Sequence, residues 1–199
     1  MFILPSKPEL RTYYREQRRL FPKADRVRAA QAATGWLLNN PLFRRSQHVA
    51  CYQSYGDEID TQYIMQITWR AGKQCYLPVV AADNTLDFVV YNQGDSLVSN
   101  RYGILEPTDK SQVIDPLDLD LIIAPLLAFD MAGRRLGTGG GYYDRTLAFK
   151  QDLPREKPFF VGFAFSVQQA DQLPEEPQDV LLDSIVTEDA WFPITKKHA

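Results

Sequence analysis

Histidine and cysteine are scarce in this sequence of 199 residues, which contains two of each. His48 is expected within a strand and His198 lies at the end of the sequence, so neither is well placed to act as a general base. The sequence also offers no Ser/His/Asp or Cys/His arrangement and no zinc-ligand spacing. Any chemistry therefore has to rest on phosphates, a metal ion and positioning, and phosphoryl transfer is the reaction class that best tolerates this shortage.

Long apolar runs are also missing, and no segment approaches the length needed to cross a bilayer. The first residues, Met1–Lys7, have a short apolar run without a leading charge, so we expect no signal peptide. Cys51 and Cys75 lie in apolar runs typical of strands, which favours buried, reduced thiols over a disulfide or a nucleophile. The formal net charge of −3 argues against general affinity for nucleic acids or membranes, although it permits a local basic patch. These features favour a cytoplasmic protein.

The composition is that of a globular domain, with 45% apolar and 24% charged residues. No repeat, low-complexity tract or linker divides the chain, so we expect one domain over residues 1–199, in which residues 1–6 are loose. We also expect a monomer that acts on a small molecule.

Apolar periodicity and turn signals predict an alternation of helices and strands. Helices are expected at Pro8–Leu20, Ala24–Asn39, Gln62–Arg70, Tyr142–Phe149 and Val167–Leu173. Strands are expected at His48–Gln53, Gln74–Val80, Asp87–Tyr91, Leu119–Ala124, Pro158–Phe165 and Ile185–Thr187, with residues 92–118 irregular. The short connection before Asp87–Tyr91 favours an antiparallel or edge strand there. The pattern predicts an α/β domain with a mostly parallel central sheet flanked by helices on both faces.

The most distinctive stretch runs from Arg134 to Arg145 and holds four of the eleven glycines within five residues. Residues without Cβ allow a ligand to approach the backbone N–H groups, and such groups just before a helix attract anions. The stretch lacks the Lys-Ser/Thr ending of a P-loop and departs from the dinucleotide fingerprint. It could also be a flexible connector, but Arg134, Arg135 and Arg145 favour a phosphate site.

Polar residues follow several of the predicted strands and should share one crevice with this glycine loop. The segments concerned are Ser54–Glu58, Pro125–Gly141 and the stretch after Phe165 that reaches Asp179. Asp144 and Asp179 are candidate Mg²⁺ ligands; the alternatives are a carboxylate that stabilises the first helical turn and an ordinary turn residue. Asp130 could orient the loop.

Further candidates are aromatic, acidic and basic. Tyr142 and Tyr143 are adjacent, so at least one should reach the crevice, where its ring suits stacking on a flat heterocycle, although both could pack in the core. Glu58 could accept hydrogen bonds from an amino-heterocycle such as a pterin, or it could be a solvent-exposed loop carboxylate. A basic stripe on the first helix could serve an anion or be a solvated face; it comprises Lys7, Arg11, Arg15 and Arg18.

The glycine-rich stretch resembles the signature of the 5-formyltetrahydrofolate cyclo-ligases, also called 5,10-methenyltetrahydrofolate synthetases. Supporting blocks cover most of the chain, at residues 7–11, 57–61, 72–73, 77–78, 102–107, 125–130, 161–165 and 183–187. The resemblance implies a single-domain enzyme that uses ATP and Mg²⁺ to convert 5-formyltetrahydrofolate, with or without a polyglutamate tail, into 5,10-methenyltetrahydrofolate, ADP and phosphate. The alternative is a non-catalytic module of the same fold that binds the nucleotide or the folate.

The resemblance also assigns roles to individual residues. Catalysis falls to Arg135 and Arg145, and Mg²⁺ binding to Asp144 and Asp179. The ATP contacts implied are Lys7, Pro8, Glu9, Leu10, Arg11, Arg135, Leu136, Gly137, Thr138, Gly139, Gly140, Gly141, Tyr142 and Tyr143. The folate contacts implied are Gln53, Glu58, Gly139, Gly140, Gly141, Tyr142 and Tyr143. One departure is Gln178, where relatives often have His, so no catalytic weight falls on that position.

Overall fold

The computed structural model describes residues 5–152 and 157–195, so the predictions for residues 1–4 and His198 lie outside the described residues. The helices are α1 (Lys7–Leu20), α2 (Lys23–Asn39), α3 (Pro41–Arg45), α4 (Gln62–Arg70), α5 (Tyr142–Thr146) and α6 (Phe149–Asp152), with 3₁₀ turns η1 (Pro116–Asp118) and η2 (Ser166–Gln168). The longer strands are β1 (His48–Ala50), β2 (Gln74–Val80), β3 (Leu86–Val90), β7 (Leu121–Ala124), β10 (Phe159–Phe163) and β11 (Ser184–Val186). The others are β4 (Leu97–Ser99), β5 (Leu105–Pro107), β6 (Val113–Ile114), β8 (Ala128–Phe129), β9 (Arg135–Leu136) and β12 (Trp191–Pro193).

An eight-stranded sheet organises the described residues, in the order β12-β11-β10-β7-β1-β2-β3-β6. The strands from β11 to β2 are parallel to their neighbours, whereas β12 at one edge and β3 and β6 at the other are antiparallel. Only residues 81–85 connect β2 to β3, which is too short for the crossover that a parallel pair requires. The predicted mixed α/β fold with a mostly parallel sheet is confirmed.

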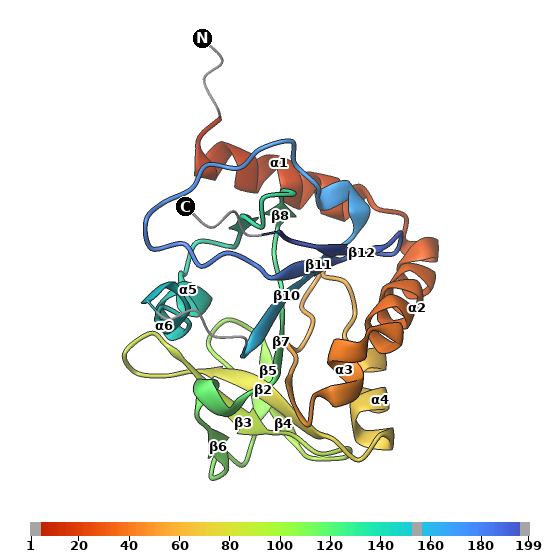
Figure 1. Ribbon diagram of the computed structural model, residues 1–199, viewed down its shortest axis with the longest axis vertical. Coiled ribbons are helices and arrows are strands. Elements are labelled where there is room, and N and C mark those ends of the chain that lie inside the picture. The colour runs from red at the N-terminus through yellow and green to blue at the C-terminus, as the bar shows by residue number, and fades with distance from the viewer. Residues whose placement is uncertain (1–4, 153–156, 196–199) are drawn as a thin grey trace.

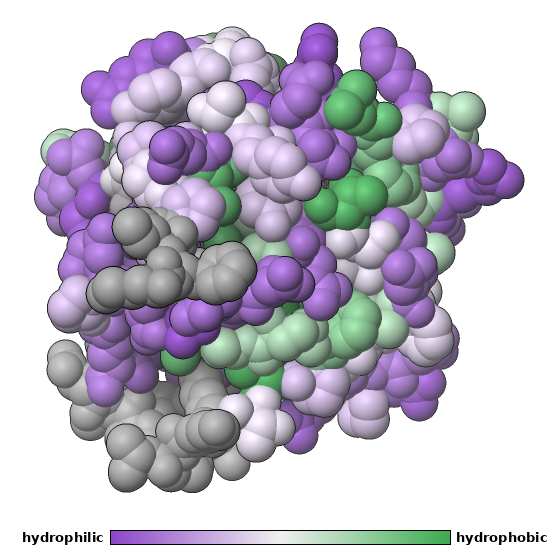
Figure 2. Space-filling view, turned by 90° about the horizontal axis from the view of Figure 1, so that it is seen from above, coloured by the Kyte–Doolittle hydropathy of each residue, from purple (hydrophilic) through white to green (hydrophobic). Residues whose placement is uncertain are grey.

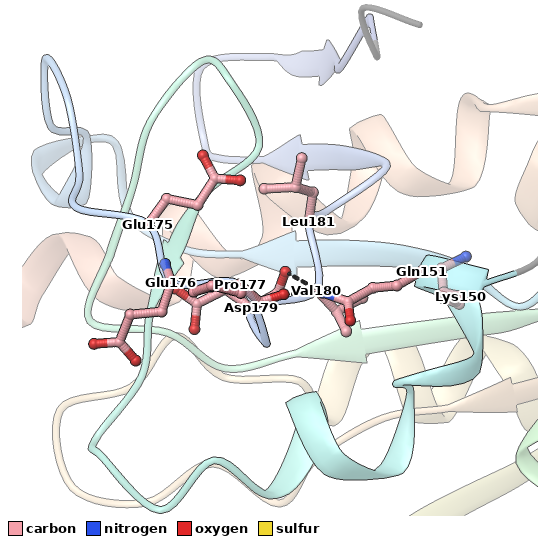
Figure 3. A pocket seen from close by; sticks show the side chains of 8 residues that line it. All are labelled: Lys150, Gln151, Glu175, Glu176, Pro177, Asp179, Val180 and Leu181. Atoms are coloured by element: carbon pink, nitrogen blue, oxygen red, sulfur yellow. Dashed lines mark hydrogen bonds between the residues drawn. The ribbon is translucent and has the colours of Figure 1, made fainter. Parts of the chain in front are cut away.

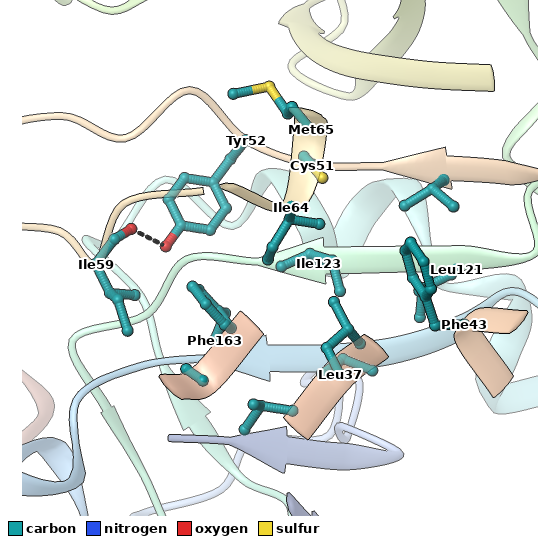
Figure 4. Close-up of a cluster of buried hydrophobic side chains, with 14 of the residues drawn as sticks. Leu37, Phe43, Cys51, Tyr52, Ile59, Ile64, Met65, Leu121, Ile123 and Phe163 are labelled. Carbon is teal, nitrogen blue, oxygen red and sulfur yellow. Dashed lines mark hydrogen bonds between the residues drawn. The ribbon is translucent and has the colours of Figure 1, made fainter. Parts of the chain in front are cut away.

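Helices cover both faces of this sheet, with α2, α3 and α4 on one side and α5 and α6 on the other (Figure 1). The α2 side packs a cluster that includes Leu37, Ile64 and Phe163, where the Tyr52 hydroxyl donates to the Ile59 carbonyl at 2.9 Å (Figure 4). The opposite face packs a second apolar cluster on α5. All four residues of β7 are buried because both of its faces are covered, as its continuous apolar run predicts.

Helix α1 lies apart from these two layers, across the end of the sheet that carries the glycine loop (Figure 1). Pro8 occupies its first turn, and the Glu9 carboxylate accepts the Ser6 backbone N–H at 2.8 Å, so the start of the helix is fixed locally. Its apolar side, with Leu10 and Tyr14, packs on the β8–β9 hairpin and on Ala170. Seen from above Figure 1, the surface is mostly hydrophilic, with apolar groups between the polar ones (Figure 2). No helix of the described residues combines the length and the apolarity that crossing a bilayer demands.

Several sequence-based boundaries are wrong. The predicted helix Tyr142–Phe149 is two short helices in the structure: α5 ends at Thr146, and α6 begins at Phe149. The predicted helix Val167–Leu173 is replaced by η2 and an extended stretch, since the Ala170 N–H donates to the Phe129 carbonyl at 2.7 Å and the Leu173 N–H donates to the Asp130 carboxylate. The region 92–118, predicted to be irregular, contains β4, β5 and β6. Cys51 and Cys75 are free and buried, as predicted.

Candidate active site

A cleft of about 550 Å³ lies where the glycine loop meets the start of α1, helices α5 and α6, and the segment around Asp179. Its lining is Lys7, Pro8, Arg11, Arg135, Leu136, Gly137, Gly139, Gly140, Gly141, Asp144, Arg145, Ala148, Gln151, Glu176, Gln178 and Asp179. The glycine loop follows β7 and the Asp179 segment follows β10, so chain segments that leave two adjacent parallel strands meet here. The third segment predicted for this crevice, Ser54–Glu58, contributes no residue to the described lining. An adjoining hollow of about 670 Å³ shares Gln151, Glu176 and Asp179; its acidic side chains come from one segment and Gln151 from α6 (Figure 3).

Two arginines hold the glycine loop from opposite sides. The Arg11 Nε donates to the Gly137 carbonyl at 3.0 Å, and an Arg145 Nη donates to the Gly140 carbonyl at 2.6 Å. Gly139 and Gly141 have φ values of +113° and +66°, a conformation that strains side chains bearing Cβ. Because α5 has only five residues, the expected attraction of anions by a helix N-terminus is small, and the guanidinium groups supply most of the positive charge.

The carboxylates in the cleft are paired with cations. Asp144 Oδ1 accepts from an Arg135 Nη at 2.6 Å and from the Val180 N–H at 3.1 Å, which joins α5 to the Asp179 segment. The Asp179 carboxylate accepts from Lys7 Nζ at 2.8 Å, and Glu176 lies 3.3 Å from the same ammonium group. The structure thus places Asp144 beside the residue that follows Asp179.

This arrangement fits a magnesium ion that is shared with a bound phosphate. The described residues contain no group of three or more His, Cys, Asp or Glu side chains that could hold a metal ion by themselves. Mg²⁺ in phosphate sites is usually held by one or two carboxylates together with substrate phosphates and water. Asp144 and Asp179 match that donor set, so the residues present fit the ion.

The two arginines with predicted catalytic roles occupy different environments. Arg135 has a side chain that is only 7% exposed, and its guanidinium lies 4.7 Å from the Phe160 ring centroid and donates to the Val180 carbonyl. Arg145 is exposed, donates to the Asn84 carbonyl at 2.9 Å, and lies over the Tyr142 ring. Arg135 therefore braces the interior wall of the cleft, whereas Arg145 secures the outer side of the glycine loop.

The two tyrosines also take different positions. The Tyr143 ring stacks on Phe160 with centroids 5.8 Å apart, and desolvation raises the pKa of Tyr143, so its hydroxyl stays protonated. The Tyr142 hydroxyl lies 2.7 Å from the hydroxyl of Tyr102, which belongs to the turn between β4 and β5. Tyr143 is thus the inner ring and Tyr142 the outer one.

Glu58 is not the solvent-exposed loop residue that was the alternative, because only 16% of its side chain is exposed. Its Oε2 accepts the Tyr55 N–H at 3.0 Å, and its Oε1 lies 3.7 Å from an Arg18 Nη. Desolvation raises the pKa of Glu58, and the Tyr55 hydrogen bond and the Arg18 charge oppose this effect. Gln53, the other residue predicted for folate, is half-buried just after β1.

Five residues predicted for ATP lie outside the lining of the cleft, among them Tyr142 and Tyr143. Glu9 caps α1, Leu10 packs under the same helix, and Thr138 is exposed in the glycine loop. The structure adds Glu176 and Gln151, which sequence reasoning missed because neither has a distinctive motif. Tyr102 was also missed as a partner of Tyr142, although its Tyr-Gly-Ile-Leu-Glu-Pro block is part of the family resemblance.

The sheet and its cleft define an α/β protein with a cleft lined by cationic side chains and glycine backbone, in loops that follow its parallel strands. Comparison with known proteins gives the family: the profile of the 5-formyltetrahydrofolate cyclo-ligase family matches residues 3–188. The chain belongs to that family.

Similar proteins support this assignment along nearly the whole chain. A 5-formyltetrahydrofolate cyclo-ligase of Escherichia coli is 41% identical over 178 residues, which cover 87% of this chain and 95% of the relative. That of Haemophilus influenzae is 37% identical, over 90% of this chain and 96% of the relative. An NMR structure of the 5,10-methenyltetrahydrofolate synthetase of Aquifex aeolicus matches with a TM-score of 0.82 and 30% identity, covering 97% of this chain and 95% of the other.

Proposed function

We propose that this protein catalyses the ATP- and Mg²⁺-dependent cyclisation of 5-formyltetrahydrofolate to 5,10-methenyltetrahydrofolate, with release of ADP and phosphate. The observation that carries the proposal is the joining of Lys7, Arg11, the glycine loop and Asp144 around one cleft in a chain of this family. This cleft offers cations and backbone to phosphates, and carboxylates to a metal ion.

The reaction needs no nucleophile from the protein, which suits a cleft in which the described lining residues include no Ser, Cys or His. The oxygen of the N5-formyl group attacks the γ-phosphorus of ATP and ADP leaves, which gives an iminium phosphate. N10 of the same substrate then attacks the formyl carbon and loses its proton. The C–O bond breaks, phosphate departs with the former formyl oxygen, and the methenyl bridge is closed.

The protein contributes positioning and charge. Lys7, Arg11 and Arg145 would bind the phosphates, and Arg135 would hold Asp144 in place. Asp144 and Asp179 would hold Mg²⁺, which when bound offsets negative charge on the phosphates. Orientation of two bound reactants can lower a barrier by roughly 7–11 kcal/mol, so a site without a general base suffices.

The part of the site that binds the folate would lie beyond Tyr143, the inner tyrosine. Glu58 offers carboxylate oxygens to the N–H groups of a pterin, and Tyr143 and Tyr142 offer ring faces for stacking. Besides burial, the Glu58 charge raises the pKa of Tyr143, which supports a common site for these two residues. Such a layout would bring the N5 formyl group toward the ATP phosphates.

The direct test mixes the purified protein with 5-formyltetrahydrofolate and Mg-ATP and follows the absorbance of the methenyl product and the release of ADP. We expect both to appear together and to stop when ATP is omitted. Absence of an ATP-dependent product would contradict the proposal. Binding of both ligands without turnover would support the alternative of a non-catalytic module.

A further inference from the structure

Arg18 is a buried cation on α1 whose hydrogen-bonding capacity is largely unused. The residue is 9% exposed, its Nε has no hydrogen-bond partner, and one Nη lies at 3.5 Å from the Leu126 carbonyl and 3.7 Å from Glu58 Oε1. A buried guanidinium with long contacts is costly for a protein, because lost hydration is poorly replaced. The arrangement therefore calls for a reason beyond the stability of the free protein.

Attachment of the end of α1 to the loop that carries Glu58 is not that reason, because a neighbouring arginine already provides this attachment. Arg26 on α2 donates to Asp57 at 2.6 Å and to the backbone carbonyls of Phe21, Arg18 and Arg19. These bonds tie the corner between α1 and α2 to the loop that carries Glu58. Arg18 is free to serve the carboxylate itself.

The surroundings of Glu58 explain what a cation can do there. Besides burial, the charge of the Glu58 carboxylate raises the pKa of Tyr52, which follows β1, and of Tyr143 on α5. Asp57, the residue before Glu58, is paired with Arg26. The Tyr52 hydroxyl donates to the Ile59 carbonyl instead of to Glu58. Burial favours the protonated acid, and Arg18 is the cation that acts against it.

We propose that Arg18 is a positioning residue for the folate, which holds Glu58 ionised and directed so that its Oε1 can accept an N–H of the heterocycle. The identity of this ligand rests on the proposed function, whereas the pairing of Arg18 with Glu58 rests on their geometry. Lys7 and Arg11 lie in the first turns of the same helix, at the cleft, and Arg18 lies eleven residues after Lys7, or about 16 Å along the axis. One helix thereby serves both ligands.

The kinetic test compares Arg18→Met and Arg18→Lys with Arg19→Met, a matched control whose exposed side chain forms an ion pair with Glu16. For Arg18→Met we expect KM for 5-formyltetrahydrofolate to rise about tenfold at pH 7, KM for ATP to stay within twofold, and the acid limb of kcat/KM for folate to move to higher pH. Arg18→Lys should lie between Arg18→Met and the wild type. An unmoved acid limb, or an equal rise of both KM values, would overturn the proposal.

A second measurement is independent of turnover. In protein labelled with ¹³C at glutamate carboxyls, the signal of Glu58 is identified by its absence from Glu58→Gln and titrated in each variant. We expect a higher pKa of Glu58 in Arg18→Met than in the wild type and Arg19→Met. If that shift appears while the wild type fails to turn over folate, only the proposed function is wrong; if turnover is normal and the pKa is unchanged, Arg18 has no such role. Should Arg18→Met fail to fold, the neutral variant Arg18→Gln replaces it, and an unchanged pKa of Glu58 there would overturn the proposal.

Discussion

At the scale of single residues, the cleft depends on charges that hold each other in place. Arg135 is bound by the Asp144 carboxylate, the Val180 carbonyl and the Phe160 ring, so its guanidinium is fixed before any ligand arrives. The sequence signature alone indicated a phosphate ligand at this position. The structure adds that Arg135 would also orient a residue proposed for the metal.

Arg135→Ala is expected to raise KM for ATP by about ten- to a hundredfold and to leave KM for folate nearly unchanged, because Asp144 loses its partner. Glu58→Ala should show the reverse pattern. Steady-state kinetics with each substrate varied in turn will measure both, with Arg28→Ala on the exposed side of α2 as the control. If both variants were defective toward the same ligand only, the division of the site would be wrong.

Glu58 should also make the free energy of unfolding depend on pH. Because burial raises its pKa in the folded state, the folded protein binds this proton more tightly than the unfolded chain does. Ionised Glu58 therefore lowers the free energy of unfolding as pH rises through the folded pKa, and this loss is absent below the ordinary pKa of glutamate.

Glu58→Gln is accordingly expected to melt at a higher temperature than the wild type at pH 7–8, and the difference should vanish at acid pH. Thermal melts followed by circular dichroism from pH 4 to pH 8 will measure it. Glu16→Gln is the control with the opposite sign, since the hydrogen bond from Arg19 lowers the pKa of Glu16. A Glu58→Gln variant that is less stable than the wild type at neutral pH would contradict the expectation.

At the scale of elements, local signals predicted well those segments that carry their own pattern. Helix α4 and strand β2 have the predicted bounds, because an amphipathic run closed by Gly72 and an apolar run with β-branched residues are sufficient. Short strands such as β8 and β9 were missed because two residues have no periodicity, and their pairing is set by tertiary contacts. The segment after η2 is likewise fixed by Phe129 and Asp130, which are distant in sequence.

The glycine loop offers a prediction at this scale. A Cβ at Gly140 would lie 2.4 Å from the Tyr142 ring, so Gly140→Ala must displace that ring and break its hydroxyl contact with Tyr102. Displacement costs about 1–3 kcal/mol, and we expect KM for ATP to rise at least fivefold. Gly35→Ala inside α2 is the matched control, since nothing lies within 4 Å of its Cβ; it should keep full activity and gain roughly 0.5–1 kcal/mol in stability. Equal kinetics for the two variants would contradict this view of the loop.

At the scale of the whole molecule, the sheet brings together groups that are far apart along the chain. The fold class and the position of the cleft after the parallel strands followed from the βαβ pattern and the glycine loop. The depth of Arg18 and the pairing of Lys7 with Asp179 did not follow, because a helical stripe gives the spacing of cations but not which of them the tertiary fold covers.

Ligand binding should stabilise the molecule in a way that depends on Mg²⁺. ATP at a hundred times its Kd is expected to add about 2.7 kcal/mol to the free energy of unfolding. Without Mg²⁺ the rise in melting temperature should be smaller, because Asp144 and Asp179 then face the phosphates without an intervening cation. Asp144→Asn should give nearly the same shift with and without Mg²⁺. Identical shifts in the wild type under both conditions would argue against a metal at this place.

The position of α1 has a consequence for synthesis on the ribosome. Helix α1 is made before the other described elements, yet side chains of α1 donate hydrogen bonds to Gly137, Gln169 and Asp179, which are 126, 155 and 172 residues later in the chain than their donors. Contacts of such long range close late in folding. The nascent chain can therefore form much of its sheet before it can form the cleft, and a polypeptide released early would be folded in part but unable to bind nucleotide.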